Sequence, residues 1–225
     1  MTPEERDGPG GGDSVCWLDR VCDSCGGLAD GPPEPVCARC GVPGWSAGCA
    51  PLFTVGHGTL SQDELVALLG VAGVDALVDI RRFPGSRAHP HVGADAMAQW
   101  LPAVGVAYRW EPRLGGRRSL SKGVSSPDTW WTVEAFRAYA AYTRTREFLA
   151  GLDDMLLQAA DQKVVVMCSE TLWWRCHRRL VADVAVLGRG RPVMHLLPAG
   201  PRVHLPAAGA RLLHDGSLVW DLPSA

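Results

Sequence analysis

A thiol, a carboxylate and an imidazole follow a short apolar run in the second half of the chain. The run KVVVMC ends in Cys168, Glu170 comes two residues later, and Cys176 and His177 stand directly before two arginines. A thiol between a strand and a cationic helix start has a lowered pKa, because the helix dipole and nearby cations stabilise the thiolate. The spacing therefore predicts Cys168 as a nucleophile. Glu170 is either a general base or the group that holds His177 in one tautomer.

The same residue types also fit a structural role. Free cysteine is often a small buried hydrophobe, so Cys168 could simply pack in the core. Cys176 is either a resolving thiol for Cys168 or a packed side chain. His177 either takes part in the chemistry or caps its loop.

Polar residues also follow two earlier strand candidates. One apolar run ends in GHGT (56 to 59) and another in DIRR (79 to 82). Ligands of open parallel sheets bind outside the carboxyl ends of the strands, and a helix N-terminus there favours an anion. Asp79 either binds a ligand hydroxyl or holds Arg81 and Arg178 in place. The predicted anion-binding residues are Gly56, His57, Thr59, Arg81 and Arg178.

Two pairs of adjacent tryptophans fall in predicted loops. They are Trp130-Trp131 and Trp173-Trp174, and the second pair lies beside the cysteines and arginines. Adjacent residues on a regular element point in different directions, so one member of each pair is expected at a surface or in a pocket. Nucleobases stack on such side chains. Trp173 and Trp174 are therefore predicted to bind substrate, or else to close the pocket as large apolar plugs.

The elements that must position these residues alternate between strand and helix from residue 51 onward. This order predicts an α/β fold with a mostly parallel sheet flanked by helices and a C-terminal β-hairpin. Ser61 and Glu64 form a capping box that starts a helix, and Asp215-Gly216 is a hairpin turn. The predicted strands are 52–56, 75–80, 106–110, 163–168 and 192–196. The other predicted helices are 94–104, 133–158 with a break at 143–145, and 175–187, and a long loop covers 111–131.

Four sequence blocks in these elements resemble a known family. They are TVGHGTLSQDELVALL, LVDIRRFPGSR, LGGRR and VVVMCSETLWWRCHRRLVADVAV, and their order and spacing cover about residues 52–197. They resemble the family catalogued as domain of unknown function 488. The resemblance implies a compact α/β fold and no settled reaction. It marks Gly56, His57, Asp79, Arg81, Pro84, Cys168, Glu170, Cys176, His177 and Arg178 as characteristic positions. Gly58 departs from the family's usual serine.

The first 50 residues differ in composition and lie outside the resemblance. They contain two CxxC pairs, Cys22/Cys25 and Cys37/Cys40, each followed by glycine. Four thiolates at this spacing predict a structural zinc site, with an iron centre as the alternative. Cys16 and Cys49 are surplus thiols, or one of them replaces a member of the four. The predicted domains are therefore a cysteine-rich, zinc-ribbon-like module (1–50) and an α/β domain (51–225).

Charge and hydropathy limit the protein's surroundings. Residues 1–50 carry eight acidic residues against three arginines, which suits a protein partner better than a phosphate backbone. Two clusters are basic instead: 81–118 with seven arginines and 175–191 with five. Every apolar stretch is too short to span a bilayer, and the N-terminus has no secretory signal. We therefore expect a cytoplasmic protein with no membrane contact and with reduced cysteines.

Together these features predict an enzyme, a hydrolase or a transferase, with an anion-binding pocket at the carboxyl edge of the sheet. The predicted substrate is a nucleotide or a nucleic acid, with base processing or glycosidic-bond cleavage by Glu170 or Asp79 as candidate chemistry. A second hypothesis follows from a loose similarity of two blocks to rhodanese-like sulfurtransferases, in which a cysteine such as Cys168 carries a persulfide. A third is a non-catalytic adaptor or sensor that binds a partner through its zinc module.

Overall fold

The computed structural model describes residues 51–120, 123 and 125–221. The predicted zinc ligands Cys22, Cys25, Cys37 and Cys40 lie outside these residues, as does all of segment 1–50. The zinc module and the domain boundary therefore stay predictions.

Six strands form one sheet in the order β3-β2-β4-β1-β5-β6. All neighbours are parallel except at one edge, where β6 runs antiparallel to β5. The five predicted strands differ from the observed ones by at most one residue at either end. The strands are β1 (Leu52–Gly56), β2 (Ala76–Asp79), β3 (Ala107–Trp110), β4 (Val164–Cys168), β5 (Val193–Leu196) and β6 (Arg202–Val203).

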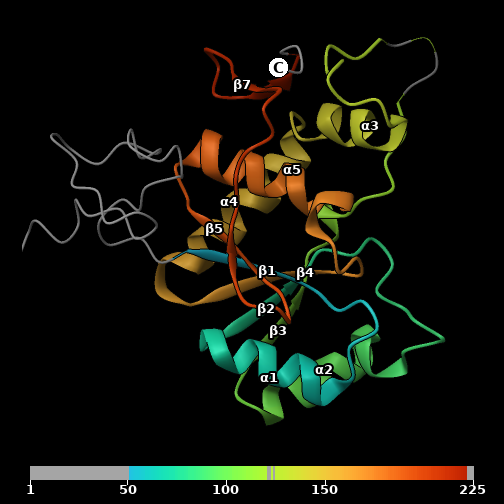
Figure 1. Cartoon of the computed structure of the whole chain (residues 1–225), viewed down its shortest axis with the longest axis vertical. Coiled ribbons are helices and arrows are strands. Elements are labelled where there is room, and N and C mark those ends of the chain that lie inside the picture. The colour runs from blue at the N-terminus through green and yellow to red at the C-terminus, as the bar shows by residue number, and fades with distance from the viewer. Residues whose placement is uncertain (1–50, 121–122, 124, 222–225) are drawn as a thin grey trace, which may run out of the picture. The chain divides into compact units, whose positions relative to one another are not determined.

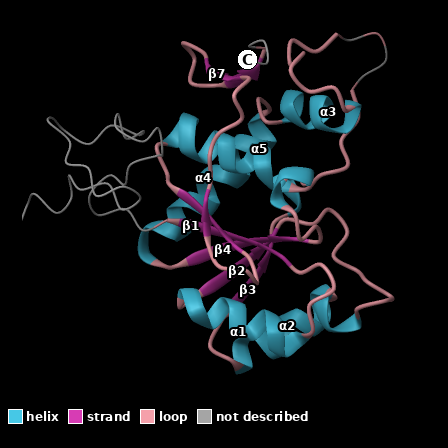
Figure 2. Ribbon diagram, in the orientation of Figure 1, coloured by secondary structure: helices cyan, strands magenta, loops and turns pink. Residues whose placement is uncertain are grey.

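Helices cover both faces of this sheet (Figures 1 and 2). Helices α1 and α2 lie on one face, and α4 and α5 lie on the other. The helices are α1 (Gln62–Ala72), α2 (Ala94–Ala103), α3 (Glu134–Tyr142), α4 (Arg146–Asp161) and α5 (Arg178–Asp183), which continues into a π-helical turn, η5 (Val184–Gly188). Three short 3-10 helices are η2 (Pro90–Val92), η3 (Pro112–Leu114) and η4 (Trp173–Arg175).

The pleat of β4 decides which layer each of its side chains enters. Val165 and Met167 pack in the core that contains residues of α1 and α2. Val164, Val166 and Cys168 pack in the core that contains residues of α4 and α5. Successive strand residues point to opposite faces. Cys168 therefore faces the layer in which α5 begins.

Local sequence signals explain where two of the helices start. The Ser61 hydroxyl accepts a hydrogen bond from the Glu64 N–H, and the Glu64 carboxylate accepts one from the Ser61 N–H, which is the predicted capping box. Thr145 accepts from the Phe148 N–H at the start of α4. The predicted break at 143–145 is thus a new N-cap that separates α3 from α4.

The helix predicted from residue 175 begins later, at Arg178. The turn η4 ends at Arg175, and Cys176 has an extended backbone with φ −123° and ψ 151°. Cys176 and His177 therefore lie in a junction between two helical segments. Strand β6 was not predicted, because two residues are too few to show a strand period.

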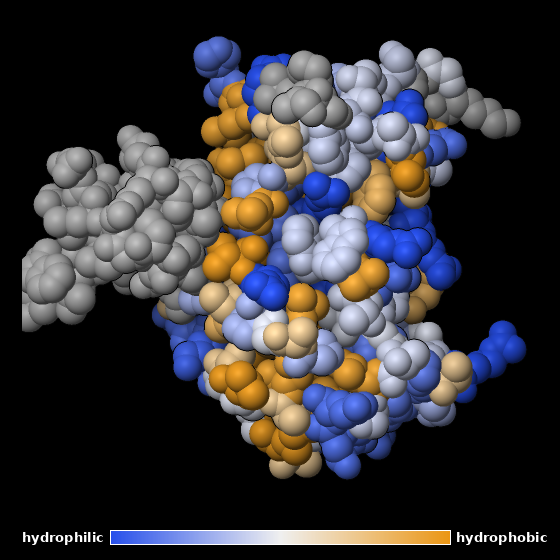
Figure 3. Space-filling model, viewed as in Figure 1, coloured by the Kyte–Doolittle hydropathy of each residue, from blue (hydrophilic) through white to orange (hydrophobic). Residues whose placement is uncertain are grey.

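The predicted C-terminal hairpin is confirmed by β7 (Ala210–Leu212) and β8 (Leu218–Trp220), which pair antiparallel. Its Trp220 is fully buried in the core on the α4 and α5 face. The α/β fold with a mostly parallel sheet, flanking helices and a hairpin is thus as predicted. Within the described residues, no helix has the length and apolar character to cross a membrane. On the face seen in Figure 3, hydrophobic residues are interspersed with hydrophilic ones.

Candidate functional site

The three strand ends that carry polar residues lie side by side in the sheet. In the pairing register, Gly56 of β1 is opposite Cys168 of β4, and Asp79 of β2 is opposite Met167. Because these strands are parallel, their carboxyl ends meet at one edge. The residues that follow them, among them His57 and Arg81, are brought to the same region, as their spacing predicts.

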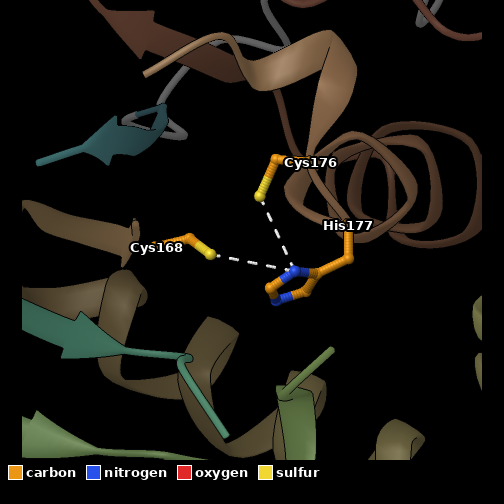
Figure 4. A group of neighbouring side chains, drawn as sticks. All are labelled: Cys168, Cys176 and His177. Carbon is orange, nitrogen blue, oxygen red and sulfur yellow. Dashed lines mark hydrogen bonds between the residues drawn. The ribbon is translucent and has the colours of Figure 1, made fainter. Parts of the chain in front are cut away.

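Two thiols and one imidazole meet at this edge (Figure 4). Cys168 Sγ lies 3.8 Å from His177 Nδ1, and Cys176 Sγ lies 3.6 Å from the same nitrogen. Both thiols point toward the ring, one from the end of β4 and the other from the junction before α5. The ring packs edge to face against Tyr139, 5.0 Å between centroids. His177 Nε2 is buried and has no hydrogen-bond partner among the described residues.

The pKa values of the two cysteines differ from the sequence prediction. A hydrogen bond to Cys176, together with burial, raises the pKa of Cys168. Burial would also raise the pKa of Cys176, but the hydrogen bond from Cys168 and the charge and N–H of Arg178 outweigh it and lower that pKa. The prediction of a lowered pKa at Cys168 is therefore wrong in direction. The positive charge and the backbone N–H of Arg178 thus favour the thiolate form at Cys176 rather than at Cys168.

Asp79 holds Arg81 in place, as predicted, but not Arg178, whose side chain donates to Thr54 and to the loop carbonyls instead. The Arg81 guanidinium donates to both Asp79 carboxylate oxygens, and the closest contact is 2.5 Å. Tyr108 donates its hydroxyl to the same carboxylate at 3.0 Å. Asp79 is fully buried, with both oxygens bonded, so it is a positioning residue.

His57 supports the same arginine from the other side. Its Nε2 lies 3.3 Å from Arg81 Nη1, and its Nδ1 lies 3.0 Å from the Gly58 carbonyl oxygen. Burial and the charge of Arg81 lower the pKa of His57 to about 4. A neutral ring has one donor nitrogen, so Nδ1–H donates to Gly58 and Nε2 accepts from Arg81.

Arg178 lies behind the thiol centre. Its side chain is 1% exposed and donates to the carbonyl oxygens of Glu170 and Thr171 and to the Thr54 hydroxyl. Its backbone N–H lies 3.5 Å from Cys176 Sγ. Arg178 therefore fixes the loop after Cys168 and contacts Cys176 through its backbone.

A buried chain of hydrogen bonds continues from Thr54 to the far side of the α5 layer. Thr54 Oγ1 lies 2.7 Å from His195 Nδ1, and His195 Nε2 lies 2.9 Å from His204 Nδ1. His204 Nε2 lies 2.7 Å from Asp183 Oδ1, and Trp220 donates to the other Asp183 oxygen. Burial and the nearby positive groups lower the pKa of His195, so that ring is neutral. The chain joins β1, β5, α5 and the hairpin.

A cavity of about 520 Å³ opens beside these groups. Cys168, Cys176 and His177 line it, so the thiol centre is accessible from the cavity. Among its described lining residues are four arginines but one carboxylate, that of Glu170. An excess of positive charge around a cavity raises the local concentration of anions. The arginines are Arg81, Arg82, Arg117 and Arg175.

Several predicted binding residues lie elsewhere. Trp173 stacks on His195, with 4.1 Å between centroids, and neither Trp173 nor Trp174 lines the cavity. The N–H groups of His57 and Gly58 donate to the carbonyl oxygens of Cys168 and Ser169, at 3.0 and 2.9 Å, so they are already bonded. Gly56 packs against the Glu170 carbonyl and Arg178, where any Cβ would clash. The predicted residues Gly56, Thr59 and Arg178 also do not line the cavity.

The sequence prediction missed several cavity residues. Phe83 is 65% exposed and lines the cavity, with the guanidinium carbons of Arg82 and Arg117 lying 5.8 and 5.9 Å from its ring centroid. Among the residues that the structure describes, Arg117 is the non-glycine residue whose φ is positive, at 56°. Its carbonyl accepts from Arg82 Nη1. The sequence signal that could have located these residues is the pair of basic clusters, 81–118 and 175–191. The two clusters lie far apart in the chain and meet at this cavity.

The centre also has the donor types of a metal site. One ligand atom from each of Cys168, Cys176 and His177 lies within 4.8 Å of the others. No other group of three or more such residues occurs in the part of the chain that the structure describes. Sulfur and imidazole nitrogen suit thiophilic ions such as zinc.

The fold and site define an α/β domain with a cysteine-histidine centre in an arginine-lined cavity. Residues 61–185 match the family described as Domain of unknown function DUF488, so the chain belongs to that family. Among solved structures, it is similar to one from Shewanella putrefaciens CN-32 described as "Putative phosphatase (DUF442)". The identity is 21%, the match covers 63% of this chain and 69% of that chain, and the TM-score is 0.30. No curated protein matches the chain significantly.

Proposed function

We propose that this protein is a thiol-dependent enzyme, a hydrolase or a transferase, that acts on an anionic substrate in the arginine-lined cavity. One observation supports the proposal above all. Cys168, Cys176 and His177 line a cavity whose described lining carries four arginines and one carboxylate. A nucleophile beside cationic binding groups is the arrangement that covalent group transfer from an anion requires.

Cys176 is the proposed nucleophile, because its sulfur lies 3.5 Å from the backbone nitrogen of Arg178 and 3.6 Å from His177 Nδ1, and the Arg178 charge helps to lower its pKa. Its sulfur forms a bond to the electrophilic atom of the substrate, and the bond from that atom to the leaving group breaks. The leaving group departs with the bonding electron pair. Water or a second acceptor then takes the transferred group and restores the thiolate. Arg117 and Arg175 hold the anion, while Arg81 is fixed by Asp79 in the cavity wall.

The proposed substrate class is phosphorylated and nucleotide-containing. Phe83 presents an exposed ring on the cavity lining, with two guanidinium carbons 5.8 and 5.9 Å from its centroid. Aromatic rings stack on nucleobases while arginines bind phosphate, so Phe83 takes over the role that the sequence assigned to Trp173 and Trp174. Glu170 is exposed at the cavity and is the carboxylate available for base processing. Asp79 is not available for base processing, because its two carboxylate oxygens accept hydrogen bonds from Arg81 and Tyr108.

Sulfur transfer is the second candidate, and the two adjacent thiols favour it. A persulfide on one thiol can be released by the other, which forms a disulfide as the outer sulfur leaves as sulfide. Persulfide found by mass spectrometry on Cys168 or Cys176 after incubation with thiosulfate would select this reaction.

Thiol labelling and ligand titration test the main proposal. In native protein near neutral pH, iodoacetamide should alkylate Cys176 faster than an ordinary thiol of pKa about 8.5. In calorimetric titrations, AMP and short oligonucleotides should bind, with affinity that falls as salt rises. Binding should be lost in Arg117→Ala and kept in Arg189→Ala, whose exposed arginine pairs with Asp153. An unreactive Cys176 overturns the thiol mechanism. No binding of any nucleotide, oligonucleotide or inorganic phosphate at low salt points instead to an adaptor.

A further inference from the structure

The three donor atoms of the thiol centre lie close together. Cys168 Sγ and Cys176 Sγ lie 3.8 and 3.6 Å from the same atom, His177 Nδ1. All three atoms lie within 4.8 Å of one another. Two thiols and an imidazole that pack only as core side chains do not need to converge in this way.

The separations match those of a tetrahedral zinc site. Zinc binds sulfur at about 2.3 Å and imidazole nitrogen at about 2.0–2.1 Å, so two such ligands at a tetrahedral angle are about 3.6 Å apart. The observed sulfur-to-nitrogen distances of 3.6 and 3.8 Å agree with this value. Small movements of the side chains would therefore complete the coordination.

We propose that Cys168, Cys176 and His177 bind one zinc ion, with the fourth coordination position open to the arginine-lined cavity. All three residues line the cavity, so the fourth position faces it. Three protein ligands with one open position are typical of reactive zinc sites, whereas structural sites have four protein ligands. Two thiolates neutralise the ion's charge. The thiol protons pass to solvent on binding.

Zinc binding affects the activity of the proposed enzyme. This consequence rests on the thiol chemistry of the proposed function. A zinc ion occupies both sulfur atoms, so Cys176 cannot attack a substrate while the ion is bound. The thiol form and the zinc form are mutually exclusive states of one centre. Free zinc then inhibits thiol chemistry, and a chelator restores it.

Peptide-resolved alkylation of the full chain tests the zinc site separately from the N-terminal cysteines. Metal is removed from the protein with EDTA, and the sample is divided into three parts. One part is treated with iodoacetamide alone and one with iodoacetamide and magnesium. The third is treated with iodoacetamide and one equivalent of zinc beyond the amount that the N-terminal cysteines bind. We expect zinc to slow labelling of Cys176 about tenfold or more, EDTA to reverse this, and magnesium, which prefers oxygen ligands, to have no effect. In the control Val71→Ala, an exposed position on α1, protection should be unchanged.

Two variants and a second ion complete the test. His177→Gln keeps both thiols but should weaken zinc protection about tenfold or more through loss of one ligand. Cobalt should give the visible absorption of tetrahedral thiolate coordination in the wild-type protein, and the part due to this centre should disappear in Cys168→Ser. The zinc site is wrong and the thiol function stands if iodoacetamide labels Cys176 in the metal-free protein, zinc does not protect Cys176, and cobalt gives no absorption difference between wild type and Cys168→Ser. If metal-free Cys176 does not label but the cobalt difference is seen, the zinc site stands and the thiol function is wrong.

Discussion

The arginines near the thiol centre have two different roles. Arg81 and Arg178 are buried and donate their hydrogen bonds to protein groups, namely Asp79 for the first and loop carbonyls for the second. Arg117 and Arg175 line the cavity. Loss of a buried arginine or its partner should therefore affect stability first. Loss of a cavity arginine should affect ligand binding first.

The Asp79–Arg81 pair gives the first prediction. Asp79→Asn leaves the Arg81 charge buried and without a carboxylate, which should cost about 3–5 kcal/mol of unfolding free energy. Urea denaturation followed by circular dichroism measures this value. Asp153→Asn is the matched control, because its ion pair with Arg189 is 54% and 28% exposed and should contribute about 0–1 kcal/mol. Equal losses in the two variants would show that the buried pair has no special role.

At the scale of elements, the segment LGGRR positions the start of α5. A Cβ on Gly116 would lie 2.8 Å from His177 Nδ1, and one on Gly115 would lie 3.0 Å from the Arg82 backbone. Both glycines therefore allow the close approach of one chain segment to another. The family block LGGRR thus has a packing explanation at these two positions.

Gly116→Ala should displace the His177 ring from the two thiols without unfolding the protein. We expect the alkylation rate of Cys176 to change several-fold, with far-ultraviolet circular dichroism unchanged. Gly70→Ala serves as the control, because a Cβ there meets no atom within 4 Å. If both variants label at the wild-type rate, the contact between Gly116 and His177 does not control the centre.

The elements were predictable because each carries a local signal. Strand β4 is a continuous apolar run, α1 has its capping box, and Thr145 marks a new helix. The meeting of strand ends follows from parallel pairing. The pKa of each thiol was not predictable, because it depends on burial, on the proximity of the two cysteines and on the charge and N–H of Arg178. These contacts need the three-dimensional path of the loop.

Trp173 shows the same limit for binding residues. Its position beside the cysteines suggested a stacking surface, but its ring lies against His195 of β5, which is distant in sequence. Phe83, in contrast, follows two arginines directly and is exposed. A single sequence does not show which aromatic side chain finds a partner in another element.

At the scale of the whole molecule, buried neutral histidines make stability depend on pH. The pKa of His57 is lowered from 6.5 to about 4, so between these values the unfolded chain binds a proton that the folded protein does not. The free energy of unfolding should therefore fall as pH decreases from 6.5 toward 4. Urea titrations at several pH values measure the slope. His57→Gln should reduce it, whereas His214→Gln, at an exposed position, should not.

The N-terminal segment gives a prediction that does not depend on the cavity. Its two CxxC pairs should bind about one zinc per chain. Elemental analysis of the double variant Cys22→Ser/Cys25→Ser should show the loss of that ion relative to wild type, while Cys168→Ser keeps it. Equal zinc contents in wild type and the double variant would refute the site.

The buried chain from Thr54 to Asp183 has a spectroscopic signature. The Asp183 carboxylate accepts from the Nε2–H of His204, and a second ring N–H lies between His204 Nδ1 and His195 Nε2. Both rings are fully buried, and these protons have no direct path to solvent. In a nitrogen-15 NMR spectrum they should give two slowly exchanging, downfield imidazole resonances. These signals would report, in solution and without any ligand, whether β5 and α5 are held together.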